Sequence, residues 1–393
     1  MELALKHLFK INSAPFSSFH TSSVHHYLTK AEFQKSIQIA ILGGHTRLGT
    51  YTSFLLKQNP LVSRLHLAES TEQIPNVAID LNTFDTKCQV ETYFGSEECI
   101  SKAIKGADVI LILPTEECNP ATPLGERIMI QGKRLYNFAK QCTIYAPRAL
   151  IVVNVPPISV SVPLVSEVFK QKSHFYHPGR IIGSAAYAQI KANTLVSRFQ
   201  GLDPAQSYVP ILGGPDLDLC VPLFSQGKPV EVFDRNDARI LTAHFRDIDP
   251  HDFPKCLGNP NYVPESTLSE SYALNQLLGT IALGICGHSE AFANVYVRCK
   301  ALDICKYLVT MVRFSRGVVV DNFEVPKLTK LELELLEKAT MEILERERMA
   351  MEFLAYVTKS NNKSKNSRVK LELPPFKEKE IEKQELLKER LIR

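Results

Sequence analysis

From residue 36 onward, short apolar runs alternate with segments of helical spacing. The runs are largely apolar, which is typical of strands buried on both faces of a parallel sheet. The clearest ones are 37–42, 64–68, 89–94, 108–113 and 150–153. Between them, apolar residues recur with helical period over 48–57, 97–104 and 125–142. This order predicts a doubly wound α/β unit with a parallel sheet over residues 36–182.

The second half of the chain has a mixed pattern. Strand-like segments at 208–212, 219–223 and 308–320 alternate with helical segments at 185–198, 234–245 and 268–286. Residues 328–357 then follow one long amphipathic helical pattern. We therefore expect an α+β domain over 183–357 that ends in this helix. After residue 357 the sequence becomes polar and then highly charged, which predicts a solvated C-terminal tail over 358–393.

Charge is distributed unevenly along the chain. The 393 residues carry a formal net charge of +4. Residues 1–35 carry +2 and residues 358–393 carry +5, so the middle, 36–357, carries −3. A nucleic-acid-binding surface on the middle of the chain is therefore not expected. If the chain has gained a new contact, the basic tail is where we expect it, with an acidic partner or with an anionic membrane surface.

The nine cysteines include no CxxC pair and show no framework spacing. This pattern favours reduced thiols over a zinc site or a secreted disulfide scaffold, so no metal-binding residue is predicted. The longest apolar stretches are also well short of the roughly 18 residues that span a membrane. We expect no transmembrane segment.

The N-terminal segment, residues 1–35, is typical of a mitochondrial presequence. Its first thirty residues contain one acid, three lysines, five serines and four histidines. Leu3, Leu8 and Phe9 could share one face of a short helix. The segment lacks arginine, which leaves a plain N-terminal extension as the alternative. The predicted location is the mitochondrial matrix, or the cytoplasm if the segment is not a presequence.

A glycine-rich turn follows the first predicted strand. The sequence Gly43-Gly44-His45-Thr46-Arg47-Leu48-Gly49 leads straight into a helix, which is the context of a Rossmann-type dinucleotide site. Gly43 and Gly49 fill the first and last glycine positions, whereas Thr46 stands where a middle glycine lets the backbone approach the pyrophosphate. Glu69 ends the second strand, where an acid binds the adenosine ribose hydroxyls. The predicted cofactor is NAD, held by Gly43, Gly44, Gly49 and Glu69 and weakened by Thr46.

The order of segments from about residue 36 to residue 357 resembles the mitochondrial-type malate dehydrogenase family, within the lactate/malate dehydrogenase superfamily. The matching stretches are 59–65 (NPLVSRL), 167–170 (EVFK), 192–194 (ANT), 201–205 (GLDPA), 209–214 (VPILGG) and 267–269 (TLS). The resemblance implies a Rossmann-type NAD domain followed by an α+β catalytic domain. It also implies a homodimer, or a heterodimer with a family member, and interconversion of malate and oxaloacetate.

The residues that carry this reaction in the family are replaced here. Dehydrogenation needs a base for the hydroxyl proton, a carboxylate that orients the base, and arginines that hold the substrate carboxylates. The base position that follows 209–214 is Pro215, which has no titratable group. The carboxylate position is Ala188, and the next arginine position is Lys191. The other family positions fall on Cys118 and Leu124 for two further arginines, and on Pro156 for an asparagine that a small alignment shift would place at Asn154.

Other groups near these positions do not replace the lost chemistry. Glu116 and Glu117 directly precede Cys118 and would raise the pKa of its thiol, which argues against a nucleophile. Asp216 and Asp218 follow Pro215 and would repel a dicarboxylate substrate. We expect these two aspartates to lie in a solvated loop.

The sequence therefore favours a mitochondrial malate dehydrogenase-family pseudoenzyme with a structural, binding or regulatory role, and no catalytic residue is assigned. The alternative is an active NAD-dependent malate dehydrogenase with a rearranged site that acts in the tricarboxylic acid cycle. A third hypothesis is a protein that binds NAD(H) without reacting.

Overall fold

The computed structural model describes residues 36–69, 77–115, 122–229, 235–246, 267–302, 304–323 and 325–363. The predicted presequence and most of the predicted tail lie outside these ranges. The strands are β1 (Ile37–Leu42), β2 (Val62–Glu69), β3 (Gln89–Phe94), β4 (Val109–Ile112), β5 (Leu150–Val153), β6 (Ile181–Ser184), β7 (Ile211–Gly213), β8 (Cys220–Pro222), β9 (Phe292–Arg298), β10 (Tyr307–Ser315) and β11 (Val318–Asn322). The α-helices are α4 (Arg47–Lys57), α5 (Val77–Leu81), α6 (Glu97–Ile104), α7 (Leu124–Tyr145), α8 (Ile158–Lys172), α9 (Ala186–Gln200), α10 (Arg235–Arg246), α11 (Thr267–Cys286) and α12 (Lys330–Lys363). Short 3₁₀ helices are η2 (Pro178–Arg180), η3 (Pro204–Gln206) and η4 (Phe224–Gln226).

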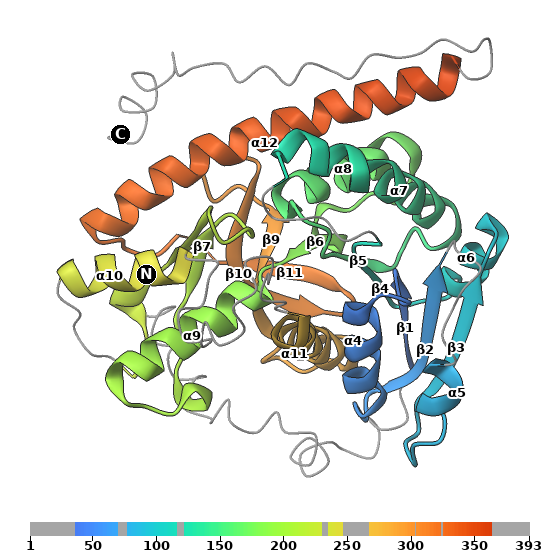
Figure 1. Cartoon of the computed structure of the whole chain (residues 1–393), viewed down its shortest axis with the longest axis horizontal. Coiled ribbons are helices and arrows are strands. Elements are labelled where there is room, and N and C mark those ends of the chain that lie inside the picture. The colour runs from blue at the N-terminus through green and yellow to red at the C-terminus, as the bar shows by residue number, and fades with distance from the viewer. Residues whose placement is uncertain are drawn as a thin grey trace, which may run out of the picture.

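One sheet runs through the described part of the molecule (Figure 1). Its strand order is β3-β2-β1-β4-β5-β6-β9-β10-β7-β8, and β11 pairs with β10. The first six strands of this order pair in parallel, as the alternation of largely apolar runs with helical segments predicted. β6 then pairs antiparallel with β9, so the sheet continues across the predicted domain boundary at residue 182. An α/β fold with a Rossmann-type half and a mixed second half is confirmed.

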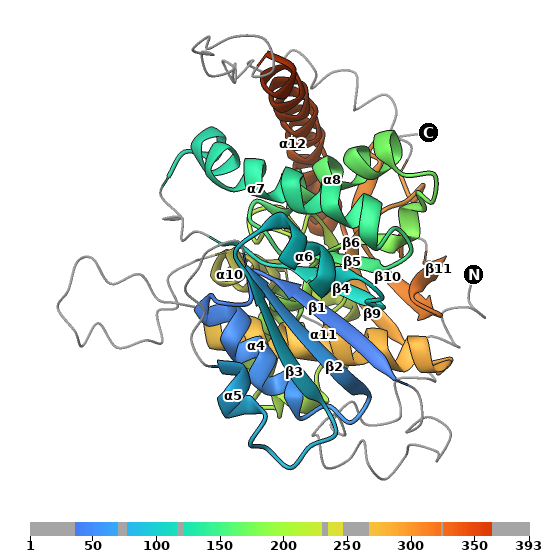
Figure 2. The ribbon, with the colours of Figure 1, turned by 90° about the vertical axis from the view of Figure 1, so that its right-hand side faces the viewer.

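The inner parallel strands β1, β4, β5 and β6 are buried on both faces because each face is covered by helices, whereas β3 lies at the edge of the sheet and, against expectation, is mostly exposed. Alternate residues of β1 enter two cores: Ile39 and Ile41 pack with residues of α4 and α11, whereas Ala40 and Leu42 pack with residues of α6, α7 and α8. Figure 2 shows α4 and α11 on one side of the sheet and α6, α7 and α8 on the other. This arrangement brings the carboxyl ends of β1, β2 and β5 to one edge.

The strand expected at 208–212 is β7, which covers only Ile211–Gly213, and two other predicted boundaries were also wrong. The stretch 308–320, expected as a single strand, folds into the β10–β11 hairpin, because Arg316 (φ 51°) and Gly317 (φ 74°) form a tight turn between the strands. The long helix continues through Lys363 instead of ending at residue 357. No proline or glycine interrupts residues 358–363, and the Thr358 hydroxyl donates to the carbonyl of Leu354 one turn earlier at 2.8 Å.

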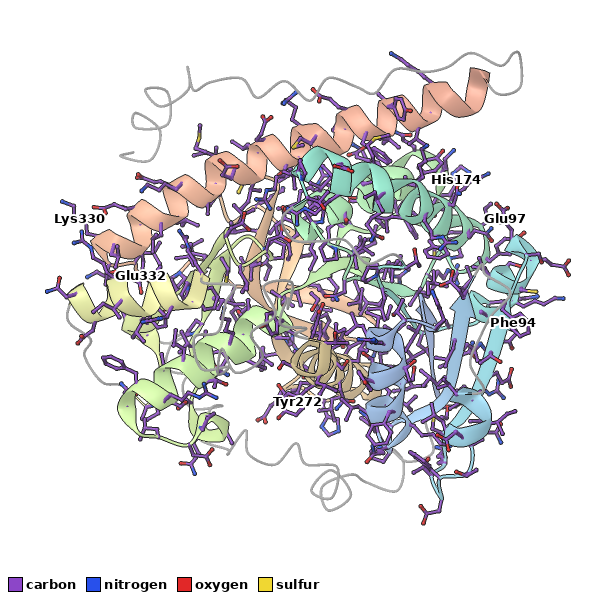
Figure 3. The ribbon with its side chains drawn as sticks, in the orientation of Figure 1. Phe94, Glu97, His174, Tyr272, Lys330 and Glu332 are labelled. Atoms are coloured by element: carbon purple, nitrogen blue, oxygen red, sulfur yellow. The ribbon has the colours of Figure 1, made fainter. Side chains whose placement is uncertain are left out.

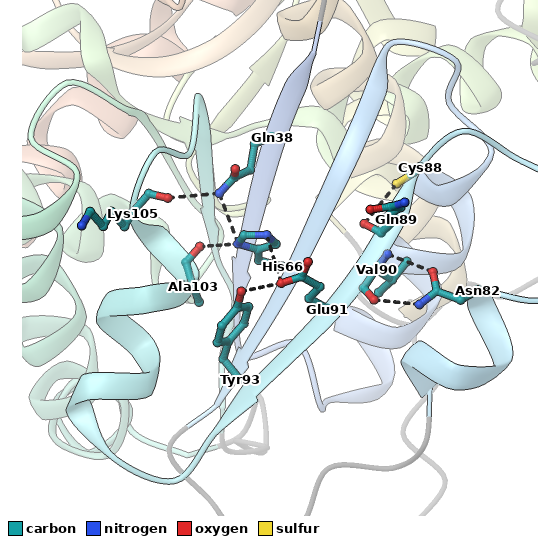
Figure 4. Close-up of polar contacts among 10 residues, drawn as sticks. All are labelled: Gln38, His66, Asn82, Cys88, Gln89, Val90, Glu91, Tyr93, Ala103 and Lys105. Carbon is teal, nitrogen blue, oxygen red and sulfur yellow. Dashed lines mark hydrogen bonds and ion pairs between the residues drawn. The ribbon is translucent and has the colours of Figure 1, made fainter.

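A buried histidine ties α6 to the first three strands (Figure 4). His66 of β2 has Nδ1 2.8 Å from the carbonyl oxygen of Ala103 in α6, and since a carbonyl only accepts, Nδ1 is the donor. Its Nε2 faces the Glu91 carboxylate at 3.8 Å, and the Tyr93 hydroxyl donates to the same carboxylate oxygen at 2.5 Å. Burial, followed by this bond to Glu91, raises the pKa of Tyr93 to about 12.

Within the described residues, no helix is long and apolar enough to cross a membrane. The cysteines in this part of the chain are free thiols: Cys88, Cys99, Cys142, Cys220, Cys286, Cys299 and Cys305.

Candidate functional site

The predicted cofactor glycines lie together in the turn between β1 and α4. Gly43 has φ +89°, a conformation that favours glycine, and its N–H donates to the carbonyl of Ala68 at the end of β2 at 3.0 Å. A Cβ on Gly49 would lie 2.6 Å from the carbonyl oxygen of Gly43, so only glycine lets α4 pack this closely on the turn. Gly44 lies between them, against Leu67. The turn thus has the close helix–strand packing of a dinucleotide loop.

Thr46 caps the N-terminus of α4 with its own side chain. It is the N-cap of α4, and its hydroxyl accepts the N–H of Gly49 at 3.1 Å and donates to the carbonyl of Gly43 at 2.9 Å. In a phosphate-binding turn, backbone N–H groups at this helix end point at the ligand. The hydroxyl of Thr46 therefore takes up a donor group that could bind a phosphate, in addition to placing a Cβ in the turn.

Glu69 lies at the carboxyl end of β2 and is completely buried. Its Oε2 is 2.5 Å from Nδ1 of His45, which projects from the glycine turn, and its Oε1 is 3.3 Å from Nη1 of Arg134 in α7. The side chains of His45 and Arg134 are 22% and 27% exposed. The residue predicted to bind ribose hydroxyls is therefore covered by two side chains of its own chain, a contact that the sequence did not reveal.

The positions that the family resemblance assigns to the base and its carboxylate hold only apolar groups. Pro215 and Ala188 are both buried. Lys191, in the next turn of α9, has its ammonium nitrogen 5.9 Å from the centre of the Phe245 ring.

Cys118 lies outside the described residues, and Leu124 is the first residue of α7. Pro156 lies just before α8.

The expectation that Asp216 is a solvated loop residue was wrong. Its carboxylate caps the N-terminus of α8, accepting the N–H of Ile158 at 3.0 Å and the N–H of Ser159 at 3.1 Å. It also accepts the hydroxyl of Ser159 and pairs with Arg346 of α12 at 3.1 Å. Arg346 is nearly buried, and its other terminal nitrogen contacts Asp218, whose side chain is largely exposed. The loop after Pro215 is thus fixed to α8 and α12.

Asn154 and Glu270 form a polar pair that sequence reasoning missed. Asn154 follows β5 and is buried, and its Nδ2 donates to Oε1 of Glu270 in the first turn of α11 at 2.6 Å. Burial raises the pKa of Glu270 above its usual value, although the hydrogen bond from Asn154 opposes the shift. The available signal was an acid directly after the TLS stretch at 267–269. The side-chain amide of Asn154 therefore already donates to an internal carboxylate.

The chain is similar in sequence to mitochondrial malate dehydrogenases, although no family model matches it. It is 28% identical to mitochondrial malate dehydrogenase of Rattus norvegicus over 310 residues, which cover 79% of this chain and 89% of the relative. Among solved structures, malate dehydrogenase from Plasmodium falciparum matches with a TM-score of 0.66 and 18% identity, over 81% of this chain and 99% of that one. A lactate dehydrogenase from Cryptosporidium parvum, complexed with lactic acid and nicotinamide adenine dinucleotide, matches with a TM-score of 0.65 and 16% identity, over 80% of this chain and 98% of that one.

Proposed function

We propose that this chain, a homologue of mitochondrial malate dehydrogenase with the lactate/malate dehydrogenase fold, does not interconvert malate and oxaloacetate and acts instead as a structural, binding or regulatory subunit. The observation that carries the proposal is the group at the base position. Pro215 is buried there and has no atom that takes up a proton. The neighbouring carboxylate of Asp216 is bound to the N-terminus of α8 and to Arg346. Steady-state turnover of oxaloacetate with NADH tests the proposal.

The competing function, an active dehydrogenase with a rearranged site, is favoured by one observation. Glu270, in the first turn of α11, is a titratable group beside Asn154 at the end of β5, and its pKa is raised, as a general acid or base would require. Its hydrogen bond to Asn154 equally explains a structural role. Turnover that is measurable in the natural protein and lost in E270Q would support the active alternative.

For the cofactor, we propose NAD as the class of ligand, bound more weakly than in the relatives. The support is the turn of Gly43 and Gly49, together with the similarity to a dehydrogenase solved with that dinucleotide. Against tight binding stand the hydroxyl of Thr46 on the Gly49 N–H and the covered carboxylate of Glu69.

For the oligomeric state, we propose a dimer, either of two copies or with a family member, through the face formed by α4 and α11. These two helices pack together, and each exposes large apolar side chains: Tyr51 is 40% exposed, Phe54 44%, Leu268 65% and Tyr272 50% (Figure 3 shows Tyr272). Exposed apolar surface of this kind on neighbouring helices is typical of an interface.

The substitution Y272E is expected to convert the dimer to a monomer, because a carboxylate in a closed apolar interface has no partner to offset its desolvation. Size-exclusion chromatography with light scattering measures the change. Ile144→Glu is the matched control, since Ile144 is 59% exposed on α7, on the opposite side of the sheet. A monomeric natural protein, or a dimer that persists in Y272E, would contradict the proposed interface.

For location, we propose that residues 1–35 direct the chain to the mitochondrial matrix. The composition of this segment and the mitochondrial relatives support the proposal. A fusion of residues 1–35 to a fluorescent protein is expected to enter mitochondria, and a chain that begins at residue 36 is expected to stay outside. Import of the shortened chain would show that the signal lies elsewhere.

We also propose that the basic C-terminal segment contacts an acidic partner. Residues 358–393 carry a net charge of +5, against −3 for residues 36–357. Removal of residues 364–393 leaves α12 whole and is expected to abolish capture of such a partner at an unchanged melting temperature. Equal capture by both forms would rule the contact out.

A further inference from the structure

We propose that the side chains of His45 and Arg134 cover the carboxylate of Glu69 and thereby block the adenosine half of the dinucleotide site. We call this blocking the closure of the site. The inference deepens the proposed weak binding of NAD and rests on the Rossmann-type site of the proposed function. In such a site the acid at the end of the second strand accepts hydrogen bonds from the ribose hydroxyls of the nucleotide. Here a nitrogen of His45 and a nitrogen of Arg134 already lie within ion-pair distance of its two oxygens.

The contacts cover both oxygens from two directions. Nδ1 of His45 lies 2.5 Å from Oε2, and Nη1 of Arg134 lies 3.3 Å from Oε1. No part of the Glu69 side chain is exposed, whereas His45 and Arg134 are each about a quarter exposed and form the outer layer. A ribose that reaches Glu69 must therefore displace at least one of them.

The two covering residues differ in how they can move away. His45 lies in the glycine turn, outside any helix or strand, and its side chain can leave Glu69 by rotating about its own bonds. Arg134 lies on α7, which is held in place by close packing against α12: a Cβ on Gly132 would lie 2.5 Å from the ring of Phe353. The helix cannot retreat, so Arg134 leaves only by a change of side-chain rotamer. The closure is thus supported by two independent elements of the fold.

Titration of the full chain with NADH, followed by the fluorescence of the reduced nicotinamide and by calorimetry, tests the closure. H45S is expected to bind NADH at least about tenfold more tightly than the natural protein, a difference of about 1.4 kcal/mol. R134M is expected to raise the affinity in the same direction, and it provides the test if H45S does not fold. His174→Ser is the matched control, because His174 is an exposed histidine on the surface near α8 (Figure 3) and should leave the affinity unchanged.

The double variant H45S/E69Q separates closure of the ribose site from a general loosening of the turn. If the gained affinity comes from freeing the carboxylate for the ribose hydroxyls, E69Q removes it again. The proposal is overturned if H45S and R134M bind NADH no more tightly than the natural protein, or if the gain survives E69Q. If the natural protein binds NADH tightly and does not turn over oxaloacetate, the closure is overturned and the proposed loss of activity stands. If the natural protein turns over oxaloacetate, the proposed function itself is contradicted.

Discussion

Purified protein supplied with oxaloacetate and NADH is expected to turn over more slowly than mitochondrial malate dehydrogenase by at least about 10⁴-fold. General acid–base catalysis alone contributes roughly 10²- to 10⁴-fold, and Pro215 removes the group that supplies it. Ala188 removes the carboxylate that would orient such a base, and Lys191 cannot offer the planar, bidentate contact of an arginine to a substrate carboxylate. Because these losses affect one transition state, a single remaining contact does not rescue the rate.

The assay requires a positive control and a test of substrate range. Mitochondrial malate dehydrogenase of Sus scrofa, a relative that is 27% identical over 310 residues, measured in parallel, shows that the conditions support the reaction. Disappearance of NADH with other 2-oxo acids is followed in the same preparation. Turnover within a hundredfold of the control enzyme would contradict the loss of activity and favour the rearranged site around Glu270.

The substitution R346M is expected to lower the free energy of unfolding by about 3–5 kcal/mol, the usual cost of removing one partner of a buried ion pair. Arg346 is nearly buried between α12 and the loop after Pro215, and without it the carboxylate of Asp216 loses its counter-charge. The same carboxylate caps α8 through the N–H groups of Ile158 and Ser159, so three elements lose their common anchor. Urea denaturation followed by circular dichroism measures the change.

A matched arginine on the same helix provides the control. Arg348 contacts Glu345 and Glu352 on the outer surface of α12, where solvent screens the pairs, and R348M is expected to cost less than about 1 kcal/mol. D216N in the R346M background should recover part of the loss, since the uncompensated charge is then gone. Equal effects of R346M and R348M would show that the buried cluster contributes nothing beyond surface pairing.

Much of the fold could be predicted from the sequence because it depends on local pattern. The apolar runs of β4 and β5 and the largely apolar run of β1 correctly predicted strands covered on both faces. Gly43 and Gly49 correctly predicted the tight turn into α4, since their positions leave no room for a side chain. The sequence alone also shows that Pro215 cannot act as a base and that Ala188 cannot act as a carboxylate, because neither side chain has a titratable group in any fold.

The predicted boundaries were wrong where the change between apolar and polar residues does not coincide with the end of a strand or helix. The hairpin of β10 and β11 has apolar residues on both sides of its turn, so 308–320 looked continuous, and only Arg316-Gly317 marked the reversal. Conversely, polar residues 358–363 are compatible with solvent and with a helix alike, and α12 continues through them.

The character of the site was decided by tertiary structure. The partners of Glu69 come from the glycine turn and from α7, 24 and 65 residues away, and the partner of Asp216 lies 130 residues away in α12. Asn154 meets Glu270 across 116 residues. In a sequence, each of these charges is compatible with solvent or with a ligand. Whether such a group faces solvent, a ligand or another side chain depends on which residue the fold brings within hydrogen-bonding distance of it. A buried charge is stable only where its partner is already in place. The sequence alone determined that side chains without a titratable group stand at the positions that the resemblance assigns to the base and its carboxylate, and only the fold determined which side chains contact Glu69, Asp216 and Asn154.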